Sequence, residues 1–164
     1  MIAIEVRRVG CLLVLAVLGG CAAPGMTGEN GRCTAEAIHQ EVVYAAPPQA
    51  IYAALTDREQ FAHLTGRAVA ELSREPGGSF SLFDGIIVGR QIELVPDRRI
   101  VEAWRERTWP EGVYSLVKFE LVPEGTGTRI VFDHTGYPDG AGEHLAIGWG
   151  ENYWEPMRTF LGED

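Results

Sequence analysis

The sequence predicts an α+β protein in which a curved antiparallel sheet wraps around a long C-terminal helix, with two short helices after the first strand. One observation is the stretch 142–161, where Trp149 and Tyr153 belong to an apolar series at helical spacing. Another is a run of strand-like segments between residues 68 and 135, whose short links are typical of an antiparallel meander. A single long helix with an apolar side must bury that side against the sheet.

The first elements of the domain are a strand and two short helices. Residues 37–44 have strand composition and end at a proline pair. Pro48 suits the first turn of a helix, and apolar residues follow it at helical spacing. Asp57 ends that helix and caps a second one, which Gly66 terminates.

Six further strands are expected before the final helix. Gly- or Pro-containing turns separate them, including a hairpin signal at Asp84-Gly85. The predicted strands span residues 68–73, 79–83, 86–95, 99–107, 113–122 and 128–135. In the final helix, Pro156 removes a backbone donor, which predicts a kink.

Composition limits the function. The chain has 164 residues, enough for one domain with a proper core, and a formal net charge of −9. An acidic chain without a large Lys/Arg cluster is a poor partner for a phosphate backbone, so we expect no nucleic-acid binding. The four histidines show no metal-ligand spacing with cysteines or carboxylates, so we expect neither a metal nor a cofactor.

The N-terminus has the pattern of an export signal over residues 1–20. Arg7 and Arg8 precede an apolar stretch at 11–18, which is too short for a permanent membrane span. The alternatives are a plain secretory signal, giving a secreted or periplasmic protein, and a true start at Met26.

The junction after the apolar stretch, LGGC at 18–21, resembles a bacterial lipobox. This resemblance implies that Cys21 carries lipid, that residues 21–36 form a flexible tether, and that the protein is anchored in the cell envelope, at the outer membrane in a Gram-negative cell. Cys11 would leave with the signal, so Cys33 would have no cysteine partner in the chain.

Several strings through the domain 37–162 resemble one family. They are VYAAP at 43–47, IYAALTD at 51–57, PGGSF at 76–80, FDG at 83–85, ELVP at 93–96, HTG at 134–136, GW at 148–149 and YW at 153–154. This set is similar to the SRPBCC (START/Bet v1-like) superfamily, in the branch of the C-terminal domain of the activator of Hsp90 ATPase. One departure is FAHLTG at 61–66, where family members often carry a Trp.

The resemblance implies a helix-grip fold that encloses an apolar cavity between the sheet and the long helix. Some members of the superfamily bind lipids, hormones or polyketides in this cavity, and others are cyclases or aromatases. The family name also implies a chaperone-cofactor role.

Strand parity identifies the side chains that face this interior. In residues 86–95, the apolar parity of Val88 and Ile92 brings Arg90 inward, and in 128–135 it brings His134 inward. Trp104 inward would bring Glu102 with it. These polar groups either form an internal Arg–Glu pair or a rim, or they orient a ligand. The predicted cavity residues are Phe80, Val88, Arg90, Trp104, Phe119, Phe132, His134, Trp149 and Tyr153.

We therefore expect a monomeric, lipid-anchored domain that binds a small apolar or amphipathic ligand between sheet and helix. We favour binding over catalysis, because no phosphate loop or nucleophile motif is present and no catalytic residue can be named. The alternatives are a cyclase- or aromatase-like enzyme in the same cavity and, if translation starts at Met26, a cytosolic Hsp90-cofactor-like stress protein.

Overall fold

One antiparallel sheet makes up most of the domain. The computed structural model describes residues 3–8 and 36–163, and within them the sheet has eight strands in the order β1-β2-β8-β7-β6-β5-β4-β3. The strands are β1 (Ala3–Arg8), β2 (Glu36–Tyr44), β3 (Glu71–Leu72), β4 (Ser79–Leu82), β5 (Ile87–Val95), β6 (Arg99–Glu106), β7 (Ser115–Glu124) and β8 (Gly127–Thr135). Strands β2 to β8 confirm the predicted order of one strand, two helices and six strands.

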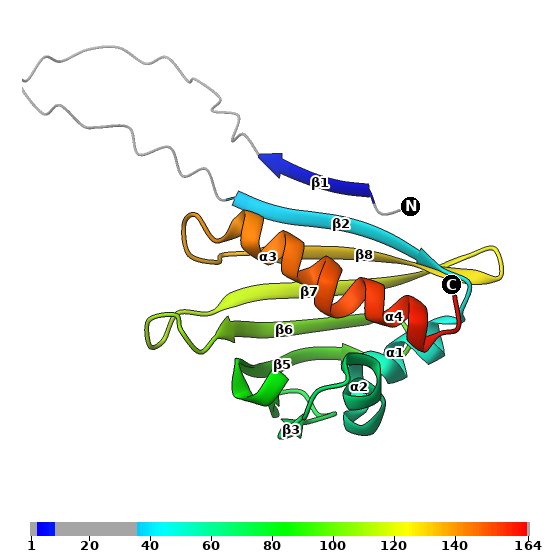
Figure 1. Ribbon diagram of the computed structural model, residues 1–164, viewed down its shortest axis with the longest axis horizontal. Helices are drawn as coiled ribbons and strands as arrows, with labels where there is room; N and C mark the ends of the chain where they lie inside the picture. Colours follow the sequence, from blue (N-terminus) through cyan, green and yellow to red (C-terminus); the bar gives the residue numbers. More distant parts are fainter. Residues whose placement is uncertain (1–2, 9–35, 164) are drawn as a thin grey trace, which may run out of the picture.

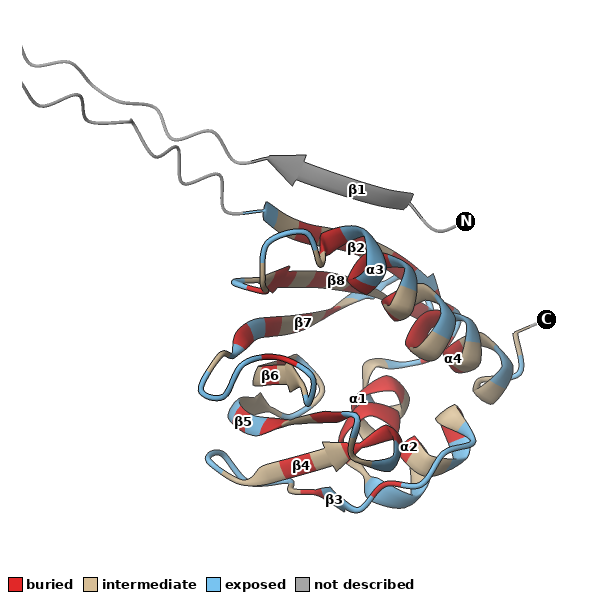
Figure 2. Ribbon diagram, turned by 60° about the vertical axis from the view of Figure 1, so that its left-hand side comes forward, coloured by how far each residue is buried: buried red, intermediate tan, exposed pale blue. Residues whose placement is uncertain are grey.

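The helices lie on one side of this sheet. The C-terminal helix, formed by α3 (Gly142–Trp149), η2 (Gly150–Trp154) and α4 (Glu155–Phe160), crosses the strands, while α1 (Pro48–Thr56) and α2 (Arg58–Thr65) lie near one end of it (Figure 1). Buried residues gather on the surfaces that these helices and the sheet turn toward one another (Figure 2). The predicted helix-grip arrangement is therefore confirmed.

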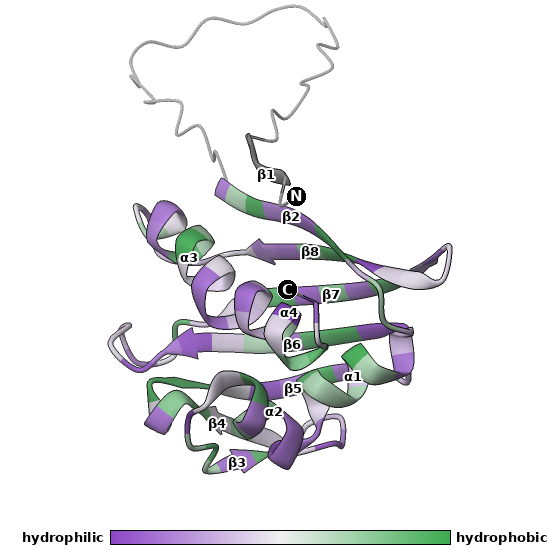
Figure 3. Cartoon of the chain, turned by 45° about the vertical axis from the view of Figure 1, so that its right-hand side comes forward, coloured by the Kyte–Doolittle hydropathy of each residue, from purple (hydrophilic) through white to green (hydrophobic). Residues whose placement is uncertain are grey.

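The two short helices begin and end where the sequence predicts. Pro48 occupies the first turn of α1. The Asp57 side chain accepts hydrogen bonds from the backbone N–H groups of Glu59 and Gln60, both at 3.1 Å, which satisfies free donors at the start of α2. Gly66 ends α2 with φ of 63°, a conformation that costs glycine little. Helix α1 is more hydrophobic than α2 (Figure 3), in keeping with its deeper burial.

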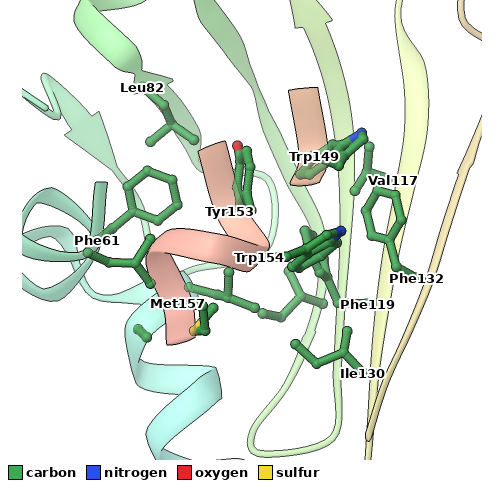
Figure 4. Packing of buried hydrophobic residues seen from close by; sticks show 14 of the residues in the cluster. Phe61, Leu82, Val117, Phe119, Ile130, Phe132, Trp149, Tyr153, Trp154 and Met157 are labelled. Carbon is green, nitrogen blue, oxygen red and sulfur yellow. The ribbon is translucent and has the colours of Figure 1, made fainter. Parts of the chain in front are cut away.

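The C-terminal helix contains one wide turn of π-helix, η2, directly before Pro156. A proline ring clashes with the carbonyl four residues earlier, here that of Asn152, and a π turn changes the local geometry that produces the clash. The widened turn also brings Trp149 and Trp154, five residues apart, onto the same side, with ring centroids 6.0 Å apart and planes inclined by 24°. Both rings are buried against the sheet (Figure 4).

The predicted N-terminal features fall mostly outside the described residues. Of the predicted signal at 1–20, the structure describes only β1, which pairs antiparallel with β2. Cys21 and most of the tether lie in the segment 9–35, so the signal, the lipid site and the tether stay predictions. Within the described residues, no helix has the length and apolar character needed to cross a membrane.

Candidate functional site

Strand β5 presents a different face to the interior from the one that parity predicts. Gln91 is buried, whereas Arg90 is exposed and donates to the Gly77 carbonyl at 3.0 Å. A β-bulge between Gln91 and Glu93 shifts the alternation by one residue, so the apolar pattern of the strand mixes two faces. The prediction that Arg90 faces inward is therefore wrong, and the two faces of the sheet separate it from Glu102.

The same shift moves Val88 away from the helix. Val88 is only half-buried, while its neighbour Gly89 faces inward. A side chain at Gly89 would collide with the Ala103 carbonyl oxygen and the ring of Phe80, so glycine allows Phe80 to approach β5 closely. Val88 is therefore wrongly placed among the predicted cavity residues.

Most of the other predicted cavity residues form solid core. Phe80, Phe119 and Phe132 are at most 2% exposed, and Phe119 and Phe132 pack on each other at 5.2 Å between ring centroids. Trp149 lies 4.4 Å from Phe132, measured between ring centroids. The prediction that Trp149 and Tyr153 face the sheet is confirmed, because they are 2% and 5% exposed.

An apolar pocket of about 180 Å³ lies between the C-terminal helix and the β5–β6 end of the sheet. Three predicted residues line it: Trp104 of β6, Trp149 of α3 and Tyr153 of η2. Their rings are in contact, with centroids of Trp149 and Tyr153 4.3 Å apart and those of Trp104 and Trp149 5.7 Å apart. Further lining comes from Arg67, Phe83, Ile86, Ile87, Glu106, His144, Leu145, Gly148 and Asn152.

Polar side chains contribute to the outer part of this lining. Arg67 lies over the Phe83 ring, 5.7 Å from its centroid. His144 Nε2 is 3.5 Å from Glu106 Oε1, and the His144 side chain is largely exposed. The pocket therefore combines apolar walls with charged groups at the surface, an arrangement that suits a small ligand with an apolar body.

His134 is buried in a complete hydrogen-bond chain. Trp149 Nε1 donates to His134 Nδ1 at 3.0 Å, His134 Nε2 lies 2.7 Å from Ser115 Oγ, and Ser115 Oγ donates to the Trp104 carbonyl at 2.9 Å. We assign the proton to Nε2, because Nδ1 accepts from the indole. Burial lowers the pKa of His134 to about 3, so the ring is neutral at pH 7. Both ring nitrogens are occupied, which makes His134 a structural residue.

A second buried polar group lies on β5 and β6. Glu102 is 6% exposed and forms no ion pair within the described residues. Burial raises the pKa of its carboxyl to about 7, and the nearby Gln91 amide opposes this shift. Gln91 stands opposite Glu102 in the β5–β6 register, yet neither polar atom of its side chain makes a hydrogen bond of standard geometry.

Tyr153 connects this polar group to the pocket. Burial raises the pKa of its hydroxyl well above the usual value, with a smaller contribution from the charge of Glu102, while the neighbouring Trp104 indole opposes the shift. The Trp104 Nε1 atom is buried and makes no hydrogen bond of standard geometry. Trp104 and Tyr153 therefore belong both to the pocket wall and to the polar group behind it.

Sequence reasoning missed three buried residues near the helix. Gln40 accepts from Trp154 Nε1 at 2.6 Å and donates to the Ala146 carbonyl at 3.0 Å. Gln40 shares its parity with Ile38 and Val42, so strand alternation was a usable signal for it. Trp154 depends on the π turn and Gln91 on the bulge, and neither has a clear signal in the sequence.

Asp133, the sequence neighbour of His134, forms its contacts on the other face of the sheet. Asp133 faces away from the helix and binds His39 at 2.7 Å and Lys118 at 2.9 Å, so it does not form a dyad with His134. In residues 3–8 and 36–163, no group of three or more His, Cys, Asp or Glu side chains is arranged to hold a metal ion.

Comparisons with known proteins agree with the fold and the sequence resemblance. The activator of 90 kDa heat shock protein ATPase homolog 2 of Mus musculus is 31% identical over 125 residues, covering 76% of this chain and 38% of that protein. Homolog 1 of Homo sapiens is 29% identical over 119 residues, covering 73% and 35%. The chain thus spans little more than a third of the length of these relatives.

A solved structure matches over a larger share of its own length. The crystal structure of an Hsp90 activator from Plasmodium falciparum has a TM-score of 0.73 and 30% sequence identity, covering 77% of this chain and 96% of that one. A protein-family model described as "Activator of Hsp90 ATPase homolog 1-like protein" matches residues 45–162. On this match, which takes in both short helices, β3 to β8 and the C-terminal helix, the chain belongs to the Activator of Hsp90 ATPase homolog 1-like family, with its SRPBCC-type fold.

Proposed function

We propose that the chain is an exported, lipid-anchored domain that holds a small apolar or amphipathic molecule in the pocket between its C-terminal helix and sheet. The observation that carries the proposal is the pocket wall formed by Trp104, Trp149 and Tyr153. Burial of apolar ligand surface against such rings is favourable, at about 25 cal/mol for each Å² removed from water.

The size of the pocket limits the ligand. Its volume is about 180 Å³. An engineered protein cavity of about 150 Å³ with apolar walls binds benzene. The proposed ligand is therefore about the size of one substituted ring or a short branched chain. A larger molecule would extend past Arg67 and His144 into solvent.

The export and anchor parts of the proposal rest on the N-terminal sequence. The apolar stretch 11–18 and the following LGGC fit a lipoprotein signal. Cleavage before Cys21 would remove β1 and leave β2 as the edge strand of the mature sheet. Residues 21–35 would then connect the lipid to the first residues of β2.

A second candidate is a cofactor role toward Hsp90, supported by the names of the relatives and the 30% identity to the Plasmodium falciparum activator. An ATP-driven Hsp90 acts in the cytosol, so the two candidates need different compartments. The mature N-terminus distinguishes them: a diacylglyceryl-Cys21 supports the anchored binding protein, and an intact Met26 start supports the cytosolic cofactor.

The test is mass spectrometry of protein purified from its own host. Denaturing spectra give the N-terminal mass, with Cys21→Ser as the control that removes the lipid site. Native spectra detect a co-purifying molecule of single-ring or short-chain size. A Tyr153→Trp variant should lose that molecule, because the larger indole ring narrows the pocket. Unlipidated Cys21 in the native protein contradicts the anchor, and empty protein that fails to take up any small apolar compound contradicts the pocket.

A further inference from the structure

Arg67 brings an unpaired positive charge to the pocket. It belongs to the segment between α2 and β3, it lines the pocket, and its guanidinium lies 5.7 Å from the centroid of the Phe83 ring. Within residues 3–8 and 36–163, this guanidinium makes no ion pair and no hydrogen bond, and the residue is bonded only through its backbone N–H, to Thr65 Oγ1. A guanidinium has five N–H donors in a fixed fork, so it can bind a carboxylate at two points.

The backbone holds Arg67 beside the apolar wall. The next residue, Ala68, accepts a hydrogen bond at 3.3 Å from the backbone N–H of Asp84, in the turn that carries Phe83. The Phe83 ring is 5% exposed and packs on Tyr153, with ring centroids 5.5 Å apart. A cation over the face of such a ring is attracted to it. The guanidinium is therefore held at the mouth of the pocket.

The turn at this mouth has an unusual backbone. Phe83 and Asp84 have φ of 51° and 59°, in a left-handed region that residues other than glycine rarely adopt. Such conformations persist where the surrounding structure enforces them, and they are frequent at ligand sites. Ile86, which follows the turn, lines the pocket and is 48% exposed. The mouth therefore presents an apolar side chain to solvent together with the unpaired cation.

The acidic residue of the lining, Glu106, already has partners. Its Oε1 atom lies 3.5 Å from His144 Nε2, and its Oε2 atom accepts from Thr108 Oγ1 at 3.3 Å. The unused charged donors in this lining therefore belong to the cation. The whole chain has a net charge of −9, so its long-range field repels anions. A preference for an anionic ligand would have to come from a local group such as Arg67.

Resting on the proposed function, we propose that Arg67 binds the carboxylate of a small monocarboxylic acid whose ring or short branched chain lies in the pocket. The apolar body contacts Trp149 and Tyr153, and the carboxylate stays at the mouth, where it accepts two parallel hydrogen bonds from the guanidinium. This position keeps the charged group out of the apolar interior, where its burial would be costly. An ammonium group at the same place would be repelled by Arg67.

The test compares two ligands of equal size, phenylacetate and phenylacetamide, by calorimetric titration of the full chain in detergent at pH 8. We expect the acid to bind about fivefold tighter at low salt, because an ion pair at an exposed site contributes modestly. Salt screens such a pair, so the preference should shrink at high ionic strength. Arg67→Gln should remove the preference and leave binding of the amide unaltered. Arg67→Lys, which keeps the charge but loses the planar fork, should retain part of it.

The control is Arg90→Gln, at an exposed arginine on the other face of the sheet, which should keep the full preference. If the amide binds and the acid binds no tighter, the pocket remains and the role of Arg67 is overturned. An unchanged preference in Arg67→Gln overturns it as well, as does tighter binding of the cationic 2-phenylethylamine than of the acid. An Arg67→Gln variant that loses the amide too would show that Arg67 shapes the pocket and does not select the head group. If no compound binds, the proposed pocket itself fails.

Discussion

Two buried polar groups lie in one row across the inner face of the sheet and differ in how their surroundings are hydrogen-bonded. Glu102 on β6 and His134 on β8 both stand opposite Val117 of the strand between them. Two strand spacings separate them, about 10 Å. His134 has a hydrogen-bond partner for each ring nitrogen, whereas beside Glu102 both polar atoms of the Gln91 side chain and the Trp104 Nε1 atom make no hydrogen bond of standard geometry.

This difference shows that burial alone does not tell how much a polar residue stabilises the fold. Burial disfavours the charged form of both groups: it lowers the pKa of His134 to about 3, and it raises that of Glu102 to about 7. The His134 network is complete within the protein, so its hydrogen bonds stabilise the fold. The polar atoms of Gln91 and Trp104 beside Glu102 lack such partners, so their burial stabilises the fold less.

The largest expected effect comes from breaking the complete network. His134→Ala leaves Trp149 Nε1 and Ser115 Oγ without their partner and opens a cavity in the core. We expect a loss of about 3 to 5 kcal/mol in the free energy of unfolding, measured by urea denaturation with tryptophan fluorescence. His144→Ala, at an exposed histidine, is the control and should stay within about 0.5 kcal/mol. A loss below about 1 kcal/mol for His134→Ala would contradict the structural role.

The next effect concerns the pH dependence that Glu102 imposes. The folded-state pKa of about 7 lies above the usual 4.5, so the folded protein holds this proton more tightly than the unfolded chain. Stability from this group is complete below pH 4.5 and is lost as the pH rises through 7. Glu102→Gln removes the dependence because the amide does not titrate. At pH 8 the variant should be about 3 kcal/mol more stable than wild type, from about 1.4 kcal/mol for each unit of pKa shift.

The measurement is urea denaturation of both proteins at several pH values between 4.5 and 8. The other titrating groups are common to both proteins and cancel in the difference between them. The two free energies of unfolding should converge at the acid end and separate on the alkaline side. A difference that stays constant over this range would mean that Glu102 keeps its ordinary pKa in the folded protein, and the effect of its burial would then be wrong.

The sequence alone predicts the sheet, its helix and the inward position of His134 and Glu102. Composition, turn signals and the helical period of Trp149 and Tyr153 indicate the sheet and its helix, and alternation correctly places His134 inside. These features succeed because local spacing and apolar burial determine them. The same alternation places Glu102 inside together with Trp104, as observed.

The core around the site contains two irregularities that local patterns do not encode. The bulge after Gln91 inverts the faces of β5, so that Arg90 and not Gln91 has the apparent inward parity. The π turn rotates Trp154 into the core, where an ideal helix would turn it aside. Both arise from tertiary packing against neighbouring elements, which a single strand or helix does not record.

Two buried glutamines allow the same comparison between polar groups with and without hydrogen-bond partners. Gln40 and Gln91 are both at most 1% exposed, but Gln40 has partners for both polar atoms and Gln91 for neither. Gln40→Leu leaves Trp154 Nε1 and the Ala146 carbonyl without their hydrogen-bond partner. We therefore expect a loss of about 2 kcal/mol in the free energy of unfolding. Gln91→Leu removes two unpaired atoms and should be neutral or stabilising. Equal losses in the two variants, measured by urea denaturation, would show that Gln91 is satisfied after all.

The smallest expected effect is at Arg90, the neighbour of Gln91 on the opposite face. The Arg90 side chain is exposed, and its hydrogen bond to the Gly77 carbonyl is open to solvent. Arg90→Ala should therefore change the free energy of unfolding by less than about 0.5 kcal/mol and leave the affinity for a small apolar compound such as toluene unaltered. Urea denaturation measures the first quantity, and calorimetric titration with toluene measures the second. A weakening of toluene binding would place Arg90 at the pocket, which requires β5 without its bulge.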